Sequence, residues 1–151
     1  MIKAIVVYDT KFGNTERIAK VLAEGMKERG VKVDCVKVEK VEIDKLTDYD
    51  LLAIGGPTHT RNISKPIKGF LERLESVDVR GMNAFAFDTR AKHAFSESAG
   101  KRVEERLKRL GMSIIRPYSS ALVKEREGPL EEEMEKMFKH ISAELVKLIQ
   151  R

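Results

Sequence analysis

The sequence predicts an α/β fold: a five-stranded parallel sheet in the strand order 2-1-3-4-5 with helices on both faces. Short apolar segments rich in β-branched residues alternate along the chain with segments whose apolar residues recur every three or four positions. Most of the strand segments are nearly continuous apolar runs, which is typical of parallel strands buried on both faces. Because crossover connections are right-handed, such a chain forms a three-layer sandwich, with its ligand site expected at the carboxyl edge between strands 1 and 3.

The first strand, the first helix and the second strand occupy residues 1–38. Residues 2–8 form a strand interrupted by a single lysine, and the helix that follows has an apolar stripe over 18–26 and ends near Gly30. Residues 31–38 alternate valine with polar residues, which indicates a strand nearer the sheet edge.

The third strand and second helix follow. Residues 50–54 are a short buried strand that ends in Gly-Gly-Pro at 55–57. Apolar residues over 63–74 predict a helix, with Ser64 as its N-cap and Pro66 in its first turn, where a missing N–H costs nothing.

The remaining elements continue the alternation. Residues 83–87 form the fourth strand, and a helical stripe over 99–110 is closed by Gly111. A fifth strand is split or short, over 113–115 and 120–123. The last helix is expected to open at Gly128-Pro129, with three glutamates at its positive N-terminal end.

Length and composition indicate one soluble domain. The 151 residues have no linker, repeat or low-complexity tract, so we expect a single domain over 1–151. No apolar run is long enough for a membrane span or a signal peptide, and we expect a cytoplasmic protein. The single cysteine, Cys35, cannot form an internal disulfide and is expected to be a buried apolar side chain. Many charged residues and a single glutamine are typical of hyperthermophile proteins.

The net charge of +5 comes from basic residues mixed with acidic ones throughout the chain. No basic arm or basic–aromatic stretch is present, so nucleic-acid binding is disfavoured. The three histidines have no metal-ligand spacing, and we expect no metal site.

A candidate phosphate site follows the first strand. The residues Thr10, Lys11, Phe12, Gly13, Asn14 and Thr15 place hydroxyls, an amide and a glycine between a strand and a helix N-terminus. Free backbone N–H groups and the helix dipole favour an anion there, and glycine lets the main chain approach a ligand. The alternative is an ordinary turn with a helix cap. The segment is neither a nucleoside-triphosphate loop nor a dinucleotide-binding turn.

This segment, YDTKFGNTERIA, resembles the phosphate-binding loop of flavodoxins and of the flavodoxin domain of flavodiiron proteins. The match is carried by Thr10, Gly13, Asn14 and Thr15, whereas Phe12 stands where short flavodoxins often have threonine. The resemblance covers nearly the whole chain. It implies a flavodoxin-like sandwich that binds FMN, with the FMN phosphate in this loop and Lys11 in solvent.

Two further loops resemble those that hold the flavin ring in this family. The segment GGPTHTRN after the third strand implies ring contacts from Pro57, Thr58, His59 and Thr60, with His59 in a stacking position. After the fourth strand, the backbone of Asp88, Thr89 and Arg90 falls where the family bonds the pyrimidine edge of FMN. The stacking tyrosine that the family often carries in this loop is missing, and His93 or Phe95 is its candidate substitute.

By resemblance, the protein is an FMN-dependent electron carrier with no catalytic side chains, because the flavin performs the redox chemistry. Short flavodoxins usually surround the flavin with carboxylates, whereas this chain places Arg61, Arg90 and Lys92 in the two ring loops. We therefore expect flavin potentials less negative than in acidic family members, measurable by potentiometric titration, and acidic redox partners.

Two alternative functions remain open, and a third is excluded by the residues at the end of the third strand. An FMN-dependent NAD(P)H:quinone or protoporphyrinogen oxidoreductase has a similar fold, as would a flavin-free interaction module. A phosphoacceptor receiver domain is excluded because its aspartate at the end of the third strand is replaced by Gly55-Gly56-Pro57.

Overall fold

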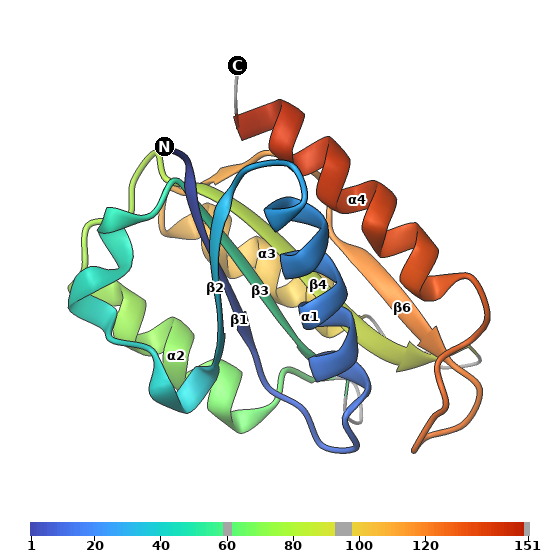
Figure 1. Cartoon of the computed structure of the whole chain (residues 1–151). Coiled ribbons are helices and arrows are strands. Elements are labelled where there is room, and N and C mark those ends of the chain that lie inside the picture. Colours follow the sequence, from blue (N-terminus) through green and yellow to red (C-terminus); the bar gives the residue numbers. More distant parts are fainter. Residues whose placement is uncertain (59–61, 93–97, 150–151) are drawn as a thin grey trace.

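The computed structural model describes residues 1–58, 62–92 and 98–149, and strands and helices alternate through it (Figure 1). The strands and α-helices are β1 (Lys3–Tyr8), α1 (Asn14–Lys27), β2 (Lys32–Lys37), β3 (Leu51–Pro57), α2 (Lys65–Arg73), β4 (Asn83–Ala91), α3 (Ala99–Arg109), β5 (Ser113–Ile114), β6 (Ser119–Val123) and α4 (Met134–Ile149). Short 3-10 helices cover Val38–Lys40, Ile43–Asp48 and Leu74–Ser76.

The sheet has the predicted order. Its strands run β2-β1-β3-β4-β5, all parallel, and β6 pairs with the second half of β4. Val6 in the middle of β1 lies beside Cys35 of β2 on one side and Ala53 of β3 on the other. The fifth strand is therefore split, as the sequence indicates, into β5 and β6.

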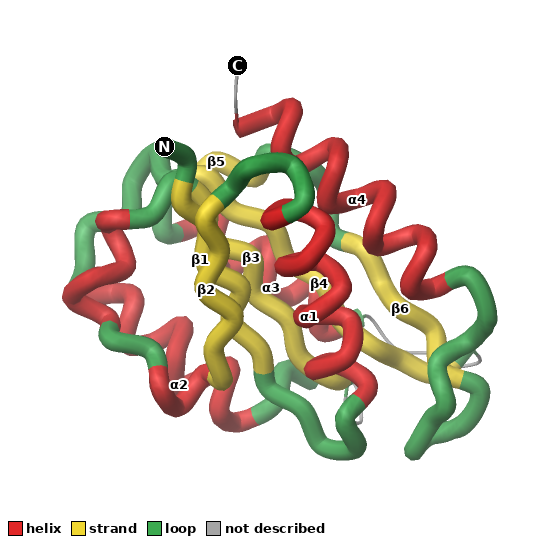
Figure 2. The backbone as a smooth tube through the Cα atoms, in the orientation of Figure 1, coloured by secondary structure: helices red, strands yellow, loops and turns green. Residues whose placement is uncertain are grey.

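Two helical layers cover the sheet. α1 and α4 lie on one face, and α2 and α3 lie on the other (Figures 1 and 2). Alternating strand residues divide the core accordingly, with Phe85 and Phe87 packed toward α1 and α4, and Ala84 and Ala86 packed toward α2 and α3. Because the strands are parallel, all of their carboxyl ends meet at one edge, where the loops to α1, α2 and α3 begin.

Two element boundaries differ from the prediction. β4 extends four residues beyond Phe87, to Ala91, because the polar residues of this stretch pair with β3 and β6 on either side. α4 begins only at Met134. The glutamates at 131–133 precede it, because Glu131 N donates to Leu122 O and Leu130 forms a bridge with Val123.

Two smaller predictions concern Ser64 and Cys35. Ser64 is the N-cap residue of α2, but its hydroxyl makes no capping bond and is buried with no hydrogen-bond partner among the described residues. Cys35 is half-buried, and burial raises the pKa of its thiol to about 11, so the thiolate is scarce at neutral pH.

Among the described residues, no helix combines the length and apolar character needed to cross a bilayer.

Candidate functional site

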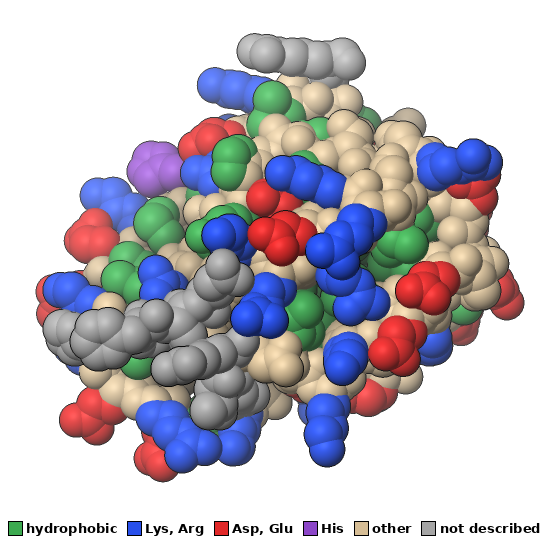
Figure 3. Space-filling model, turned by 180° about the vertical axis from the view of Figure 1, so that it is seen from behind, with side chains coloured by type: hydrophobic (Ala, Val, Ile, Leu, Met, Phe, Trp, Pro, Cys, Tyr) green, Lys and Arg blue, Asp and Glu red, His purple; other side chains and the backbone are tan. Residues whose placement is uncertain are grey.

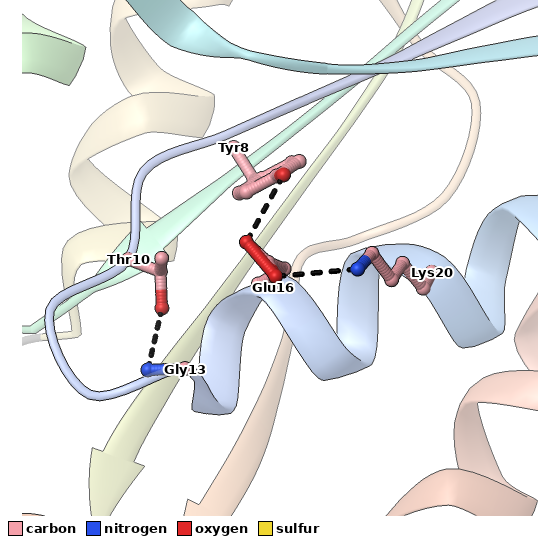
Figure 4. Close-up of polar contacts among 5 residues, drawn as sticks. All are labelled: Tyr8, Thr10, Gly13, Glu16 and Lys20. Atoms are coloured by element: carbon pink, nitrogen blue, oxygen red, sulfur yellow. Dashed lines mark hydrogen bonds and ion pairs between the residues drawn. The ribbon is translucent and has the colours of Figure 1, made fainter.

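The loop between β1 and α1 is folded around the Thr10 hydroxyl, which accepts a hydrogen bond of 3.0 Å from Gly13 N (Figure 4). A hydroxyl that accepts one bond keeps its own hydrogen for a second partner. Thr10 therefore organises the loop and can still donate to a ligand.

Gly13 turns the chain into α1 with a φ of +93° and a ψ of −8°. This left-handed conformation is one that side-chain-bearing residues rarely adopt. Apart from Gly13 itself and its two chain neighbours, no heavy atom of the described residues lies within 4 Å of the position that a Cβ would take at Gly13. The glycine is therefore required by the backbone angle, and the space beside it is open.

The N-terminus of α1 has unsatisfied donors. No side chain caps the helix, and the first helical bond is Arg17 N to Gly13 O. Within residues 1–58, 62–92 and 98–149, no protein acceptor is bonded to the N–H groups of Asn14, Thr15 and Glu16. Unsatisfied N–H donors at the positive end of a helix dipole are the groups that an anion requires.

The one carboxylate in the first turn of α1 is held by other residues. Glu16 accepts hydrogen bonds from the Tyr8 hydroxyl at 3.2 Å and from Lys20 at 3.2 Å (Figure 4). Lys20 lowers the pKa of Glu16, whereas burial and then Glu16 raise the pKa of Tyr8 to about 12. Lys20 thus offsets the negative charge that Glu16 brings to this helix end.

A buried hydroxyl pair joins α1 to β4. The Oγ1 atoms of Thr15 and Thr89 lie 2.8 Å apart, and both residues are buried. In such a pair one hydroxyl donates to the other, which leaves a single hydrogen to donate elsewhere. The pair fixes the start of α1 against the end of β4.

A second polar cluster joins β3 and β4 to the start of α3. Asp88 is fully buried, and its Oδ2 accepts from the Thr58 hydroxyl at 2.9 Å and from Gly100 N at 3.0 Å. Thr58 Oγ1 accepts in turn from Ala99 N at 2.9 Å. The two side chains therefore accept the first two N–H groups of α3, and the Ser98 hydroxyl, as the N-cap, accepts from Lys101 N at 3.1 Å.

The segment before α4 lies against the β1–α1 loop. Asn14 Nδ2 donates to Glu127 O at 3.2 Å, and a Cβ placed at Gly128 would lie 2.9 Å from the Asn14 side chain. The side chain of Asn14 thus holds this segment, so its amide nitrogen is already engaged within the protein.

An open cleft of about 550 Å³ adjoins the loop. It is lined on one side by Asp9, Thr10 and Lys11 and on the other by residues 62–66, at the start of α2. Phe12 at the loop tip is 42% exposed, and the Lys11 ammonium lies 5.4 Å from its ring centroid.

The structure brings the three predicted loops together, but not all of the predicted side chains face one space. Thr15 bonds Thr89, and Thr58 bonds Asp88, so the start of α1 and the residue after β3 are each directly linked to β4. Pro57 is the last residue of β3, beside Thr89, and Arg90 donates from Nε to Ser120 Oγ at 3.2 Å. His59 and Thr60 lie outside the described residues.

The expected loop at Asp88, Thr89 and Arg90 is the correction that matters most. These residues belong to β4, where Asp88 and Thr89 pair with β3 and all three residues pair with β6, so they form a strand and not a loop. Sequence reasoning also missed Glu127 as the partner of Asn14. The Gly128-Pro129 turn is the only local signal that the chain bends there.

Comparison with known proteins connects this geometry to one family. The flavodoxin family model matches residues 6–141. A flavodoxin from Aquifex aeolicus is 34% identical over 99 residues, covering 65% of this chain and 51% of the relative. An uncharacterized protein of Methanocaldococcus jannaschii, MJ0732, is 27% identical over 140 residues, which is 90% of this chain but 34% of that protein.

Solved structures agree on the fold. A flavodoxin from the domain Archaea superimposes with a TM-score of 0.84 over 99% of this chain and 100% of that chain, at 20% identity. The curated relatives are longer, and the chain spans from about a third to about half of the two named above.

Proposed function

The chain belongs to the flavodoxin family, and from this premise we propose that it binds FMN without covalent attachment and carries electrons as a flavodoxin-like redox protein. The flavin would supply the electron chemistry when bound. The protein would bind and orient it, acting as a carrier rather than as a stand-alone catalyst.

The N-terminus of α1 is the observation that carries this proposal. Its unsatisfied N–H groups at Asn14, Thr15 and Glu16, together with the Thr10 hydroxyl, form a donor set that fits the dianionic phosphate of FMN. Backbone donors fixed by a helix need no reorganisation on binding. Lys11 is exposed beside this loop and would add charge attraction that solvent screens.

The ends of β3 and β4 are proposed to support the flavin ring. Pro57, Thr58, His59 and Thr60 would run along it, as the family resemblance implies. Asp88 and Thr89 would position the elements around the flavin, because the Asp88 side chain fixes the start of α3 and the Thr89 side chain fixes the start of α1. Arg90 would contribute its positive charge near the ring, held by Ser120.

The most direct test is the chromophore of the purified protein. We expect yellow protein that releases FMN, and not FAD, on denaturation, and we expect colourless protein to bind added FMN with a dissociation constant at or below the micromolar range. Protein that is colourless and takes up no FMN would overturn the assignment as a carrier and leave a flavin-free module of the same fold.

Stopped-flow mixing with NADPH distinguishes the carrier from an FMN-dependent NAD(P)H oxidoreductase. A carrier is expected to show flavin reduction by NADPH at least about a thousandfold slower than the turnover typical of enzymes. Reduction within the mixing time, and its reversal by a quinone, would favour the enzyme.

A further inference from the structure

A basic groove lies between α2 and α3, on the face opposite α1 and α4. It has a volume of about 330 Å³, and the charged residues that line it are Lys68, Arg102, Glu105, Arg106 and Arg109. Four cations therefore face one carboxylate. Figure 3 shows this side of the molecule, with Lys and Arg side chains gathered across its centre.

Three of the four cations in this groove, Lys68, Arg106 and Arg109, have no ion-pair partner in the part of the chain that the structure describes. Glu104, the residue before Glu105 on α3, is buried, accepts a hydrogen bond from Tyr118 N and forms an ion pair with Lys108.

Several cations elsewhere on the surface form short ion pairs. Arg17 bonds Glu135, Arg80 bonds Asp78 and Arg116 bonds Glu144, each with an N···O distance of 3.0 Å or less. The unpaired cations Lys68, Arg106 and Arg109 lie in a concave surface, where low-dielectric walls focus the field and raise the local positive potential. The groove is therefore complementary to an anionic partner.

The groove is continuous with the cleft beside the β1–α1 loop. Asn62 and Ile63 line both of them. A molecule seated along α2 and α3 would therefore reach the edge of the site proposed for the flavin.

The spacing of the cations favours a protein over a small anion. Arg102, Arg106 and Arg109 follow one another at intervals of four and three residues, so they form one stripe along α3. Seven residues of helix span about 10 Å. A stripe of this length matches several carboxylates spaced across a protein surface, whereas a phosphate group would engage only one or two of the cations.

We propose that this basic groove docks the acidic face of a redox partner protein and places the partner beside the flavin cleft. The inference rests on the proposed function, since docking would serve the transfer of one electron from the reduced partner to the bound flavin. The partner is a protein with a patch of Asp and Glu side chains around its redox centre.

An acidic plant-type [2Fe–2S] ferredoxin is the probe, and its affinity is measured by titration calorimetry at low ionic strength. The triple variant Lys68→Gln, Arg106→Gln, Arg109→Gln is expected to bind at least about tenfold more weakly than the parent. The matched variant Arg29→Gln, Lys32→Gln, Lys147→Gln removes the same charge elsewhere and is expected to change affinity by less than about twofold. Parent affinity is expected to fall as salt rises.

Equal losses in the two triple variants would overturn the proposal, since net charge alone would then explain binding. The proposal would also be overturned if the ferredoxin did not bind the parent, or if inorganic tripolyphosphate bound the groove while the ferredoxin did not. FMN uptake is measured on all three proteins. Normal FMN uptake without ferredoxin binding refutes the docking groove alone, whereas ferredoxin binding without FMN uptake refutes the carrier function alone.

Discussion

Replacement of Asp88 by alanine is expected to lower the free energy of unfolding by about 3 kcal/mol. Asp88 is fully buried and accepts from the Thr58 hydroxyl and Gly100 N, and hydrogen bonds to a charged group contribute about 1.5–3 kcal/mol each. Alanine would leave two donors without an acceptor and remove a negative charge from the N-terminus of α3. Urea unfolding measures the loss as a lower midpoint with an unchanged slope.

Asp78→Ala is the control for this prediction. Asp78 is an exposed carboxylate that bonds Arg80, with 2.9 Å between Arg80 Nε and Asp78 Oδ1. Exposed ion pairs contribute little, so Asp78→Ala is expected to move the urea midpoint far less than Asp88→Ala does. Similar losses in the two variants would contradict the role of Asp88 in joining β3, β4 and α3. Asp88→Asn, which keeps one acceptor oxygen, is expected to lie between them.

Gly13→Val is expected to weaken FMN binding by about a hundredfold, equivalent to about 2.7 kcal/mol. A β-branched residue does not tolerate the φ of +93° found at Gly13. The loop would rotate out of this conformation and misdirect the N–H groups at the start of α1. Quenching of flavin fluorescence during titration of the apoprotein measures the change.

Gly30→Val separates the effect of backbone strain from that of the loop. Gly30 has a φ of +87° and open space around the position of its Cβ, so it matches Gly13, but it lies at the other end of α1. Valine there is expected to reduce stability by about 1–3 kcal/mol and to leave FMN affinity within about twofold. If Gly30→Val weakens FMN binding as much as Gly13→Val, the phosphate loop is not responsible.

Much of the fold could be predicted because strand and helix periodicities are local. The apolar run at 2–8 and the stripe over 99–110 correspond to β1 and α3. The end of β4 could not be predicted, because Asp88 and Thr89 are polar and their partners Thr58 and Thr15 are distant in sequence. A buried polar residue with a non-local partner looks, in sequence, like a loop residue.

The candidate site was predictable to a similar degree. Thr10 and Gly13 have a local pattern that points to an anion site, and the structure shows the hydrogen bond between them. The engagement of Asn14 by Glu127 was not predictable, since 113 residues separate them. The basic groove depends on how α2 packs beside α3, and no single segment contains its charge pattern.

The start of α1 is proposed to bind the phosphate of a flavin nucleotide. Titration of the apoprotein with FMN and with riboflavin, which lacks only the phosphate, tests it directly. Several charge-assisted hydrogen bonds to the dianion predict that FMN binds at least about a hundredfold more tightly than riboflavin. Equal affinities for the two flavins would contradict the claim, because the phosphate would then contribute nothing.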